Sequence, residues 1–543
     1  MVTAIYLPRL KSIFLTRAQT TRKNICQAFM YQGFIKIKGV CVIQFLLNNT
    51  PIEIQECSPS LTILDWLRTK KGKMGTKEGC ATGDCGACTI LVGEERINAN
   101  GQASWQYKTM NSCLLLLGNA HAKHIVTVEA VTTGLYPNLT DLHPVQRALV
   151  ECHGSQCGFC TPGIIMSLLA LYINEPTYPG KKAVIHALGG NLCRCTGYSP
   201  ILLAAEKAYS YERKAEPYST MAAKFKASLN TQYDDDVPFL KNGPRKFYLP
   251  QTAQQLVELK ALYPYAHLVA GGTDFAIELS QNMLLPDVII SLSQVKELCT
   301  LADNNGELHI GAALPYSQFV EAFYNHYPES KELFERLGSS QVRNSGTLGG
   351  SIGNASPIGD PAPLLIALNA SMDLLSSAGT RTIKVADYFI DYKKTVLKSD
   401  EVISKFTIPK RPESLKLACH KISKRFEDDI STVCLVLAIE HSQNMITQAR
   451  CAMGGMAAIP KRAQHIEKKL ISQSLQVSTF IDAATAINDD FAPMSDVRSS
   501  AHYRSTVSKN LLQRIGIEFC DAQPSSSKNN NNIAITRISH ASL

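Results

Sequence analysis

Hydrophobic and polar positions alternate with different periods along the chain. Near the N-terminus, the stretch VIQFLLNNTPIEIQ has two apolar runs separated by Asn-Asn-Thr-Pro, which predicts a β-hairpin. The next apolar stretch, SLTILDWLRTK, places Ile63, Leu64 and Leu67 on one helical face behind Ser60, which predicts a short helix capped by that serine. This part of the chain therefore combines strands with one helix.

Two later segments have helical spacing and begin alike. CTPGIIMSLLALYINEP and CTGYSPILLAAEKAY each carry a proline in the first turn, Pro162 or Pro200, behind Thr161 or Ser199 as the expected N-cap. Each predicted helix therefore starts beside cysteines. Between 211 and 245 the periodicity is lost among charges and prolines, which predicts a linker.

Length and composition limit the admissible classes of protein. A chain of 543 residues is too long to fold around a single hydrophobic core, so about three to four domains are expected. An apolar content of 45% and a charged content of 19% are typical of a soluble globular protein. No apolar run approaches the roughly 18 residues of a membrane span, so no membrane partner is expected.

The net charge of +9 is concentrated at the N-terminus. Residues 1–52 hold seven basic side chains and no acidic one, so the remainder is nearly neutral, which argues against a nucleic-acid partner. An arginine-containing, acid-free leader is typical of a mitochondrial-type presequence, and the alternative is an upstream start with Met30 as the true first residue. In either case we expect residues 1–39 to be poorly ordered.

Eight of the 17 cysteines form two sets, which favours metal over disulfides. The first set has the spacing C-x4-C-x2-C with a distant fourth member: Cys80, Cys85, Cys88 and Cys113. This is the plant-type ferredoxin spacing for a [2Fe-2S] cluster, and nearby glycines let backbone N–H groups approach the sulfides. Zinc is the alternative, although it is normally bound by two C-x2-4-C knuckles.

The second set pairs C-x2-C with C-x-C: Cys157, Cys160, Cys193 and Cys195. Because the predicted helices begin at these pairs, two helix N-termini point at the thiolates, and helix N-termini stabilise anions such as an all-thiolate cluster. Zinc remains possible here as well. Two neighbouring clusters would pass electrons from one to the other, whereas two zinc ions would give the two adjacent cysteine sets no shared function.

Two glycine-rich stretches follow the predicted linker. LVAGGTDFAIEL is an apolar strand that runs into Gly-Gly-Thr-Asp, and SGTLGGSIGNASPIGDPAP is a longer loop of the same kind. Successive N–H groups in such turns form concave anion sites. Neither G-x-G-x-x-G nor G-x-x-x-x-G-K-[ST] occurs, so Rossmann and P-loop interpretations fail. On pattern alone, these loops are either anion sites or ordinary turns.

EGCATGDCGAC, GSQCGFCTPG and GNLCRCTGYSPI resemble the two iron–sulfur modules of the xanthine dehydrogenase and molybdenum hydroxylase family over residues 40–210. The resemblance implies that the first cysteine set ligates one [2Fe-2S] cluster and the second set the other. It also implies that Gln156 approaches the molybdopterin of a docked partner.

The two glycine-rich loops are similar to the FAD-binding domain of this family and of vanillyl-alcohol-oxidase-type flavoproteins. The resemblance assigns the FAD diphosphate to the first loop: Ala270, Gly271, Gly272, Thr273 and Asp274. It assigns the phosphate, ribose and isoalloxazine to the second: Thr347, Gly350, Asn354 and Asp360. Ser351 stands where the family usually has Asn, which puts a direct hydrogen bond from that position in doubt.

KISKRFEDDIS resembles the family segment beside the flavin ring and the nicotinamide site, with Lys421 near the flavin and Asp428 near the pyridine nucleotide as the residues of catalysis. Without the resemblance, this stretch is equally typical of a solvated, charged strand end. CAMGGMAAIPKRA resembles the family's C-terminal α+β domain.

The expected fold class is multidomain α+β. Its parts are a leader (1–39), a β-grasp [2Fe-2S] ferredoxin domain (40–125), a helical-bundle [2Fe-2S] domain (126–212), a linker (213–240), a two-part α+β FAD-binding domain (241–415), a C-terminal α+β domain (416–522) and a disordered tail (523–543).

A flavin converts the single electrons of clusters into the hydride that nicotinamide accepts. The family's molybdopterin domain is not found before the chain ends. The resemblance therefore implies the electron-transfer subunit of a two-chain, NAD⁺-dependent xanthine dehydrogenase, in which a large molybdopterin-binding subunit oxidises hypoxanthine or xanthine to urate, as a dimer of heterodimers. Reduced thiolates and the lack of a signal peptide suggest the cytoplasm.

Three alternatives remain: the equivalent subunit for aldehydes or N-heterocycles, a stand-alone iron–sulfur flavoprotein carrier, and a zinc-stabilised interaction protein.

Overall fold

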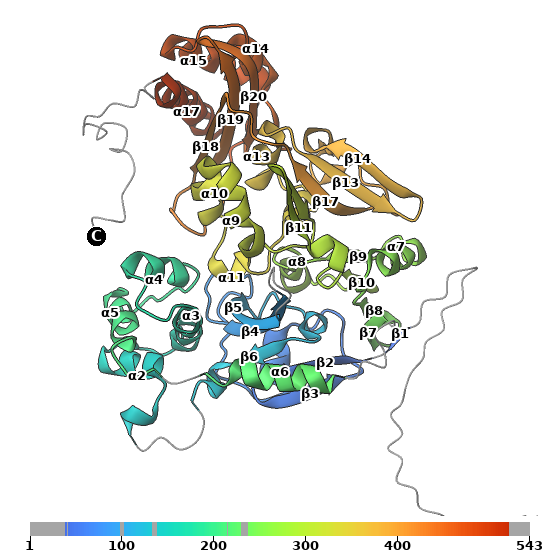
Figure 1. Ribbon diagram of the computed structural model, residues 1–543, viewed down its shortest axis with the longest axis vertical. Helices are drawn as coiled ribbons and strands as arrows, with labels where there is room; N and C mark the ends of the chain where they lie inside the picture. The colour runs from blue at the N-terminus through green and yellow to red at the C-terminus, as the bar shows by residue number, and fades with distance from the viewer. Residues whose placement is uncertain are drawn as a thin grey trace, which may run out of the picture.

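The computed structural model describes residues 39–40, 42–97, 103–132, 138–213, 216–229 and 237–520. It confirms the multidomain α+β class (Figure 1). The N-terminal sheet and the helices α2 to α5 lie next to each other at one end of the molecule, and the C-terminal domain lies at the other end. The expectations for the leader up to residue 38 and for the tail fall outside the described residues.

The first domain is a five-stranded sheet in the order β3-β2-β6-β4-β5. Its elements are β2 (Ile43–Leu47), β3 (Thr50–Ile54), α1 (Ile63–Thr69), β4 (Thr89–Ile97), β5 (Ala103–Asn111) and β6 (His124–Val126). The predicted hairpin is confirmed, because β2 and β3 pair antiparallel around Asn48 and Asn49. The predicted cap Ser60 is wrong. The side chain of Thr62 accepts the hydrogen bond from the Asp65 N–H and begins the helix.

The second domain consists of helices: α2 (Pro144–Glu151), α3 (Thr161–Asn174), α4 (Lys181–Leu188) and α5 (Ser199–Ala208). Both predicted caps are wrong by one residue. Thr161 and Ser199 are the first helical residues, and Cys160 and Tyr198 occupy the N-cap positions. Helix α3 is buried along most of its length, which explains its almost continuous run of apolar residues.

The segment predicted as a linker contains a helix, α6 (Tyr218–Ser228), that the sequence interpretation missed. Its buried face consists of Tyr218, Ala222 and Phe225. The ring of Tyr218 packs against Tyr107 and His124 of the first domain. The connection between the second and third domains is thus anchored to the first.

The third domain corresponds to the expected FAD-binding domain (241–415) and is called the flavin-type domain below. It has two sheets. The first has the order β1-β7-β8-β10-β9 and contains β1 (Gly39–Val40), β7 (Val237–Asn242), β8 (Arg245–Tyr248), α7 (Ala253–Leu262), β9 (His267–Val269), α8 (Phe275–Gln281) and β10 (Val288–Ser291). Strand β1 pairs parallel with β7, so Gly39, which was assigned to the leader, lies in a sheet.

The second sheet has the order β11-β12-β17-β13-β14 and encloses the largest part of the core. Its elements are β11 (Leu301–Asn304), β12 (Glu307–Gly311), α9 (Tyr316–His326), α10 (Lys331–Glu335), α11 (Ser340–Arg343), α12 (Leu348–Gly353), α13 (Pro361–Ala367), β13 (Ser371–Ser376), β14 (Gly379–Lys384) and β17 (Val402–Ile408), with the hairpin β15 (Phe389–Asp391) and β16 (Lys394–Thr395).

The C-terminal domain packs a β18-β19-β20-β21 sheet against helices. Its elements are β18 (Leu415–Ile422), β19 (Val433–Ser442), β20 (Met445–Gly454), β21 (Lys461–Arg462), α14 (Gln464–Leu470), α15 (Val477–Ala484), α16 (Ile487–Asp490) and α17 (Ala501–Cys520). Short 3₁₀ turns occur at Leu117–Ala120, Val128–Ala130, Leu139–Asp141, Lys296–Cys299, Pro328–Ser330 and Val385–Asp387.

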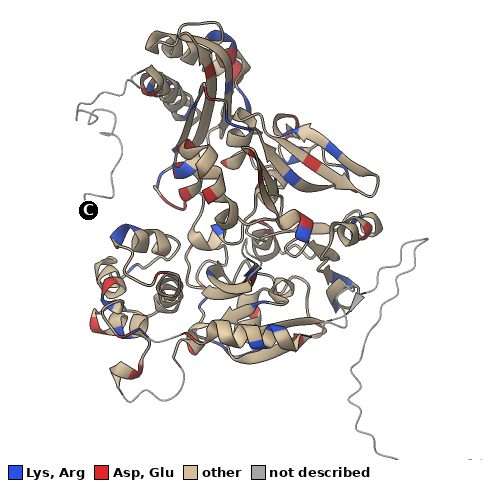
Figure 2. Cartoon of the chain, viewed as in Figure 1, with Lys and Arg blue, Asp and Glu red and all other residues tan. Residues whose placement is uncertain are grey.

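Acidic and basic residues are interspersed on the elements of every domain (Figure 2). This mixture agrees with the nearly neutral charge of the chain beyond its N-terminal segment. Among the helices of the described ranges, none is both long enough and apolar enough to cross a membrane.

Candidate functional site

The first cysteine set lies on the loop between α1 and β4 and just after β5. Cys88 and Cys113 are buried, with their Sγ atoms 3.3 Å apart, far longer than the roughly 2.05 Å of a disulfide. Cys80 and Cys85 form a second thiol pair, in which a hydrogen bond from Cys85 lowers the pKa of Cys80 to about 4. The structure therefore brings the four predicted thiols together in two pairs.

The loop that carries this set is shaped by glycine. Gly83 and Gly86 have φ angles of 84° and 68°, in the region that favours glycine. A Cβ on Gly79 would lie 2.8 Å from the Sγ of Cys85. The backbone N–H of Thr82 lies 3.4 Å from the Sγ of Cys80, so the loop directs a donor at a sulfur. Such donors stabilise anionic thiolates and tune the potential of a bound cluster.

The second set lies at the helix starts of the helical domain. Cys160 caps α3 and interacts with the Cys193 thiol, and burial raises the pKa of Cys160 to about 12. The Sγ of Cys193 lies 3.2 Å from the hydroxyl of Thr196. Cys157 and Cys195 form the other pair and are exposed. This set too consists of two thiol pairs beside helix N-termini.

The pairing distinguishes the two metals that the sequence left open. A [2Fe-2S] cluster takes two ligands at each iron, which suits two pairs of thiols. Structural zinc instead needs four ligands around one ion. The donor sets therefore fit binuclear iron–sulfur clusters.

Backbone atoms join the two cysteine loops. The N–H of Leu192, which precedes Cys193, donates to the carbonyl of Cys85 at 3.0 Å. The side-chain amide of Asn191 donates to the carbonyl of Gly86 at 3.1 Å. The two cysteine loops are thus held in direct contact across a domain boundary.

The two glycine-rich loops of the flavin-type domain also touch. Gly271 packs so closely on the carbonyl of Ser345 that a Cβ would overlap it. Gly272 has a φ of 75°, and its Cβ would lie 2.9 Å from the carbonyl of Leu114, the neighbour of Cys113. The first loop therefore lies between the second loop and the first cysteine set.

In the second loop, Thr347 caps α12 and its hydroxyl accepts from the Gly350 N–H at 3.0 Å. Asn354 is the C-cap residue of the same helix. Asp360 is buried and pairs with Lys421 at 2.8 Å. The two residues assigned to the flavin from separate segments thus form one ion pair.

Partners from other elements surround this ion pair. The hydroxyl of Ser431 donates to the second oxygen of Asp360, and the Nζ of Lys421 also donates to the carbonyl of Arg336 at 2.9 Å. The carboxylate and the ammonium are therefore both satisfied without bulk water, as buried charges require.

Asp428 lies apart from this pair, in the loop between β18 and β19, with a φ of 49°. Burial raises its pKa to about 6, and the negative charge of Asp84 on the first cysteine loop adds to the shift. Its neighbours of opposite charge are Arg425, Arg343 and Lys421. The carboxyl group of Asp428 therefore combines a raised pKa with a position near the first cysteine loop.

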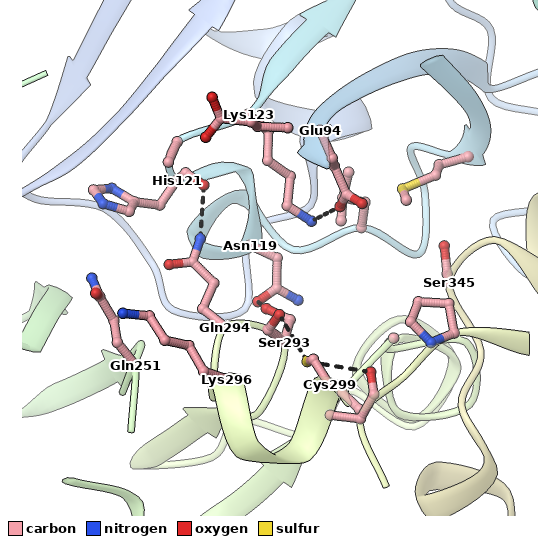
Figure 3. A pocket seen from close by; sticks show the side chains of 18 of the residues that line it. Glu94, Asn119, His121, Lys123, Gln251, Ser293, Gln294, Lys296, Cys299 and Ser345 are labelled. Atoms are coloured by element: carbon pink, nitrogen blue, oxygen red, sulfur yellow. Dashed lines mark hydrogen bonds and ion pairs between the residues drawn. The ribbon is translucent and has the colours of Figure 1, made fainter. Parts of the chain in front are cut away.

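A cavity of about 490 Å³ opens beside the glycine-rich loops (Figure 3). Such a volume lies in the range of about 300–1,000 Å³ that is usual for ligand sites. Opposite the loops, Lys123 and Glu94 of the first domain form an ion pair of 2.6 Å. Gln294, Lys296 and Cys299 also line it, and sequence reasoning missed all three because no motif contains them.

The predicted flavin residues divide into two groups around this cavity. Those that line it are Ala270, Gly271 and Thr347. Those that do not are Gly272, Thr273, Asp274, Gly350, Asn354, Asp360 and Lys421. The close backbone approach of the loops and the adjoining cavity fit a bound dinucleotide such as FAD.

Models of four protein families match consecutive parts of the chain. They are a 2Fe-2S iron–sulfur cluster binding domain at residues 45–117, a [2Fe-2S] binding domain at 127–206, an FAD binding domain in molybdopterin dehydrogenase at 242–411, and a CO dehydrogenase flavoprotein C-terminal domain at 418–519. The chain belongs to the molybdenum hydroxylase family. It carries the family's two [2Fe-2S] domains, FAD-binding domain and flavoprotein C-terminal domain.

Similar curated proteins of this family include xanthine dehydrogenase of Emericella nidulans, 30% identical over 92% of this chain and 40% of the relative. Xanthine dehydrogenase/oxidase of Gallus gallus is 31% identical over 76% of this chain and 35% of the relative. The chain thus spans about 40% of the length of the fungal relative. Among solved structures, quinoline 2-oxidoreductase of Pseudomonas putida 86 matches 50% of this chain and 95% of that chain, with a TM-score of 0.47 and 24% identity.

Proposed function

We propose that this molybdenum hydroxylase chain is the electron-transfer subunit of an NAD⁺-dependent xanthine dehydrogenase. A partner chain holds the molybdopterin centre, where hypoxanthine and xanthine are oxidised to urate, and the pair assembles as a cytoplasmic dimer of heterodimers. Electrons pass from that centre through two [2Fe-2S] clusters to FAD and then to NAD⁺. The names of the similar curated proteins, xanthine dehydrogenase and xanthine dehydrogenase/oxidase, support this substrate.

One observation carries the proposal: the candidate centres follow one another from the surface inward. Cys157 and Cys195 of the second set are exposed, whereas Cys88 and Cys113 of the first set are buried. The carbonyl of Leu114, next to Cys113, faces the first flavin-type loop. This order supports a route from an external donor, through two clusters, to a flavin.

The exposed end of the route has the character of a docking surface. Phe159 and Leu192 each expose 47% of their surface beside Cys157 and Cys195, and Gln156 is exposed with them. Apolar side chains around exposed ligands suit contact with a protein that supplies electrons at short range. We assign this face to the molybdopterin-binding partner.

The residues of the flavin side have separable roles in the proposal. When bound, FAD exchanges single electrons with the clusters and a hydride with NAD⁺. The loops would hold its phosphates with backbone N–H groups. The buried Lys421–Asp360 ion pair would lie on the flavin side of the site. Asp428, with its raised pKa, lies on the loop assigned to the pyridine nucleotide.

The test is anaerobic purification of the chain alone, followed by optical spectra and assays of dye reduction by NADH. The proposal predicts iron–sulfur and flavin absorbance and NADH-dependent dye reduction, without xanthine oxidation. Xanthine turnover by the isolated chain, or a flavin that NADH does not reduce, would contradict it.

Two further measurements separate the alternatives. Co-purification from the native source should yield a molybdenum-containing chain, and its absence would favour a stand-alone carrier. A substrate panel on the complex then decides between purines and the aldehydes or N-heterocycles of an equivalent subunit. Preferential turnover of an aldehyde would reject the xanthine assignment while leaving the electron route intact.

A further inference from the structure

A glutamine from the flavin-type domain reaches between the two cysteine domains. Gln341 belongs to α11 and is 1% exposed. Its Nε2 lies 3.0 Å from the Oδ1 of Asn191 and 3.3 Å from the hydroxyl of Ser167, both in the helical domain. The same nitrogen lies 3.3 Å from the hydroxyl of Thr89, which follows Cys88 in the first domain. One side-chain amide of the flavin-type domain thus contacts polar groups of both cysteine domains.

The network continues from Gln341 to the first cysteine loop. The hydroxyl of Ser167 donates to the Oδ1 of Asn191 at 2.6 Å, which fixes the orientation of that amide. The Nδ2 of Asn191 then donates to the carbonyl of Gly86, which lies between Cys85 and Cys88. A continuous path of hydrogen bonds therefore links the flavin-type domain to the backbone that carries the thiols.

The surrounding backbone leaves little room for rearrangement. A Cβ on Gly190 would overlap the side chains of Ser339 and Gln341, and a Cβ on Gly86 would overlap the carbonyl of Gly190. Because Gly86 and Gly190 have no Cβ, one segment from each of the three domains can pack closely at this junction. Any change at Gln341 is thus transmitted to the cysteine loops rather than absorbed by a loose interface.

Stability alone does not account for a glutamine here. Its Oε1 is buried and has no hydrogen-bond partner among the described residues, which is an energetic cost that an apolar side chain would avoid. The amide is therefore best explained by what its nitrogen does for the neighbouring loops.

We propose that Gln341 is a positioning residue that fixes the two cysteine loops relative to each other and sets the reduction potential of the cluster held by Cys80, Cys85, Cys88 and Cys113. The inference rests on the proposed function, because it requires both clusters to be present. Hydrogen bonds near the sulfurs and solvent exposure set such potentials. A loosened junction admits water, and a more polar surrounding favours the reduced cluster with its extra negative charge.

The experiment is a redox titration of the full-length chain, purified anaerobically and followed by electron paramagnetic resonance. The variant Gln341→Met keeps the side-chain volume and removes the contacts of the Nε2 with Asn191, Ser167 and Thr89. We expect the midpoint of the first cluster, identified as the signal lost in Cys113→Ser, to move to a higher potential. The expected shift changes the equilibrium constant for electron transfer between the two clusters about threefold to tenfold. A tenfold change corresponds to about 59 mV for one electron.

The magnetic coupling between the two reduced clusters should weaken at the same time. The matched control is Gln513→Met in α17, because this helix belongs to the C-terminal domain at the end of the molecule away from the cysteine domains. It should leave both midpoints and the coupling unchanged. Ser167→Ala removes one link of the network without adding volume, and it should shift the midpoint in the same direction by a smaller amount, which keeps the test decisive if Gln341→Met does not fold.

The outcomes separate the two proposals. A wild-type chain without two binuclear signals would count against the proposed function. A wild-type chain with both signals, and Gln341→Met and Ser167→Ala variants with unchanged midpoints and coupling, would overturn the role of Gln341 alone.

Discussion

The substitution Gly163→Ala tests the contact between the two cysteine domains most sharply. Gly163 lies in the first turn of α3, and a Cβ there would lie 2.1 Å from the carbonyl oxygen of Gly86. An ordinary contact is 3.4 Å or longer, so one segment must move by about 1.3 Å. The same Cβ would lie 3.2 Å from the Nδ2 of Asn191, which donates to that carbonyl.

The expected loss of stability follows from two opposing effects. Alanine favours a helix by about 0.5–1 kcal/mol over glycine, which alone would stabilise α3. Forcing an extra methyl into a packed interface costs about 1–3 kcal/mol. The displacement also weakens the Asn191–Gly86 and Leu192–Cys85 hydrogen bonds, each with a net contribution of about 1 kcal/mol. We expect a net loss of about 2–3 kcal/mol.

Urea unfolding followed by tryptophan fluorescence measures this loss. Both tryptophans of the chain, Trp66 and Trp105, belong to the first domain, so their emission reports on the side of the contact that receives the clash. Gly353→Ala is the control, because its Cβ would meet only Ile403 at an ordinary 3.5 Å. The control should be neutral or slightly stabilising. A Gly163→Ala variant at least as stable as the wild type would refute the reasoning.

Three further predictions concern the flavin side. Because the pKa of Asp428 is raised to about 6 from 3.8, its ionisation destabilises the folded state progressively as the pH rises from about 4 to 6. Asp428→Asn should therefore stabilise the protein by up to about 3 kcal/mol at pH 7.5 but not at pH 4. Urea unfolding midpoints at the two pH values measure this difference. Lys421→Met leaves Asp360 buried without a counter-ion and should cost about 3–5 kcal/mol in urea unfolding, whereas the double variant with Asp360→Leu should recover part of it. Thr347→Ala removes the cap bond to Gly350 and should cost about 1 kcal/mol by thermal unfolding, with Thr347→Ser close to wild type.

Features encoded in short stretches of sequence could be predicted. The spacing of eight cysteines indicated two sets, and the structure brings each set together in two pairs. The hairpin around Asn48 was predictable because its turn and both apolar runs are contiguous. The cap predicted at Ser60 is wrong, because the spacing of apolar residues does not show which hydroxyl accepts the first backbone N–H. The hydrogen bond from the Ile63 N–H to the Leu115 carbonyl, made by a distant segment, fixes where the helix begins.

Contacts between domains could not be predicted in the same way. Gln341 is 150 positions from Asn191 and 252 from Thr89, so no local pattern connects them. Asp360 and Lys421 were each assigned to the flavin, yet nothing in the sequence indicated that they pair with each other. The spacing of Tyr218, Ala222 and Phe225 is that of a helical face, but charged neighbours and Pro217 obscured it in the sequence.

The central claim is that each cysteine set holds one [2Fe-2S] cluster. The most direct measurement is low-temperature electron paramagnetic resonance of the dithionite-reduced chain, with Cys113→Ser and Cys195→Ser measured alongside it. The account predicts two distinct binuclear signals in the wild type, one lost in each variant while the other persists. A wild-type protein that is colourless and contains zinc, or that gives only one signal, would contradict it.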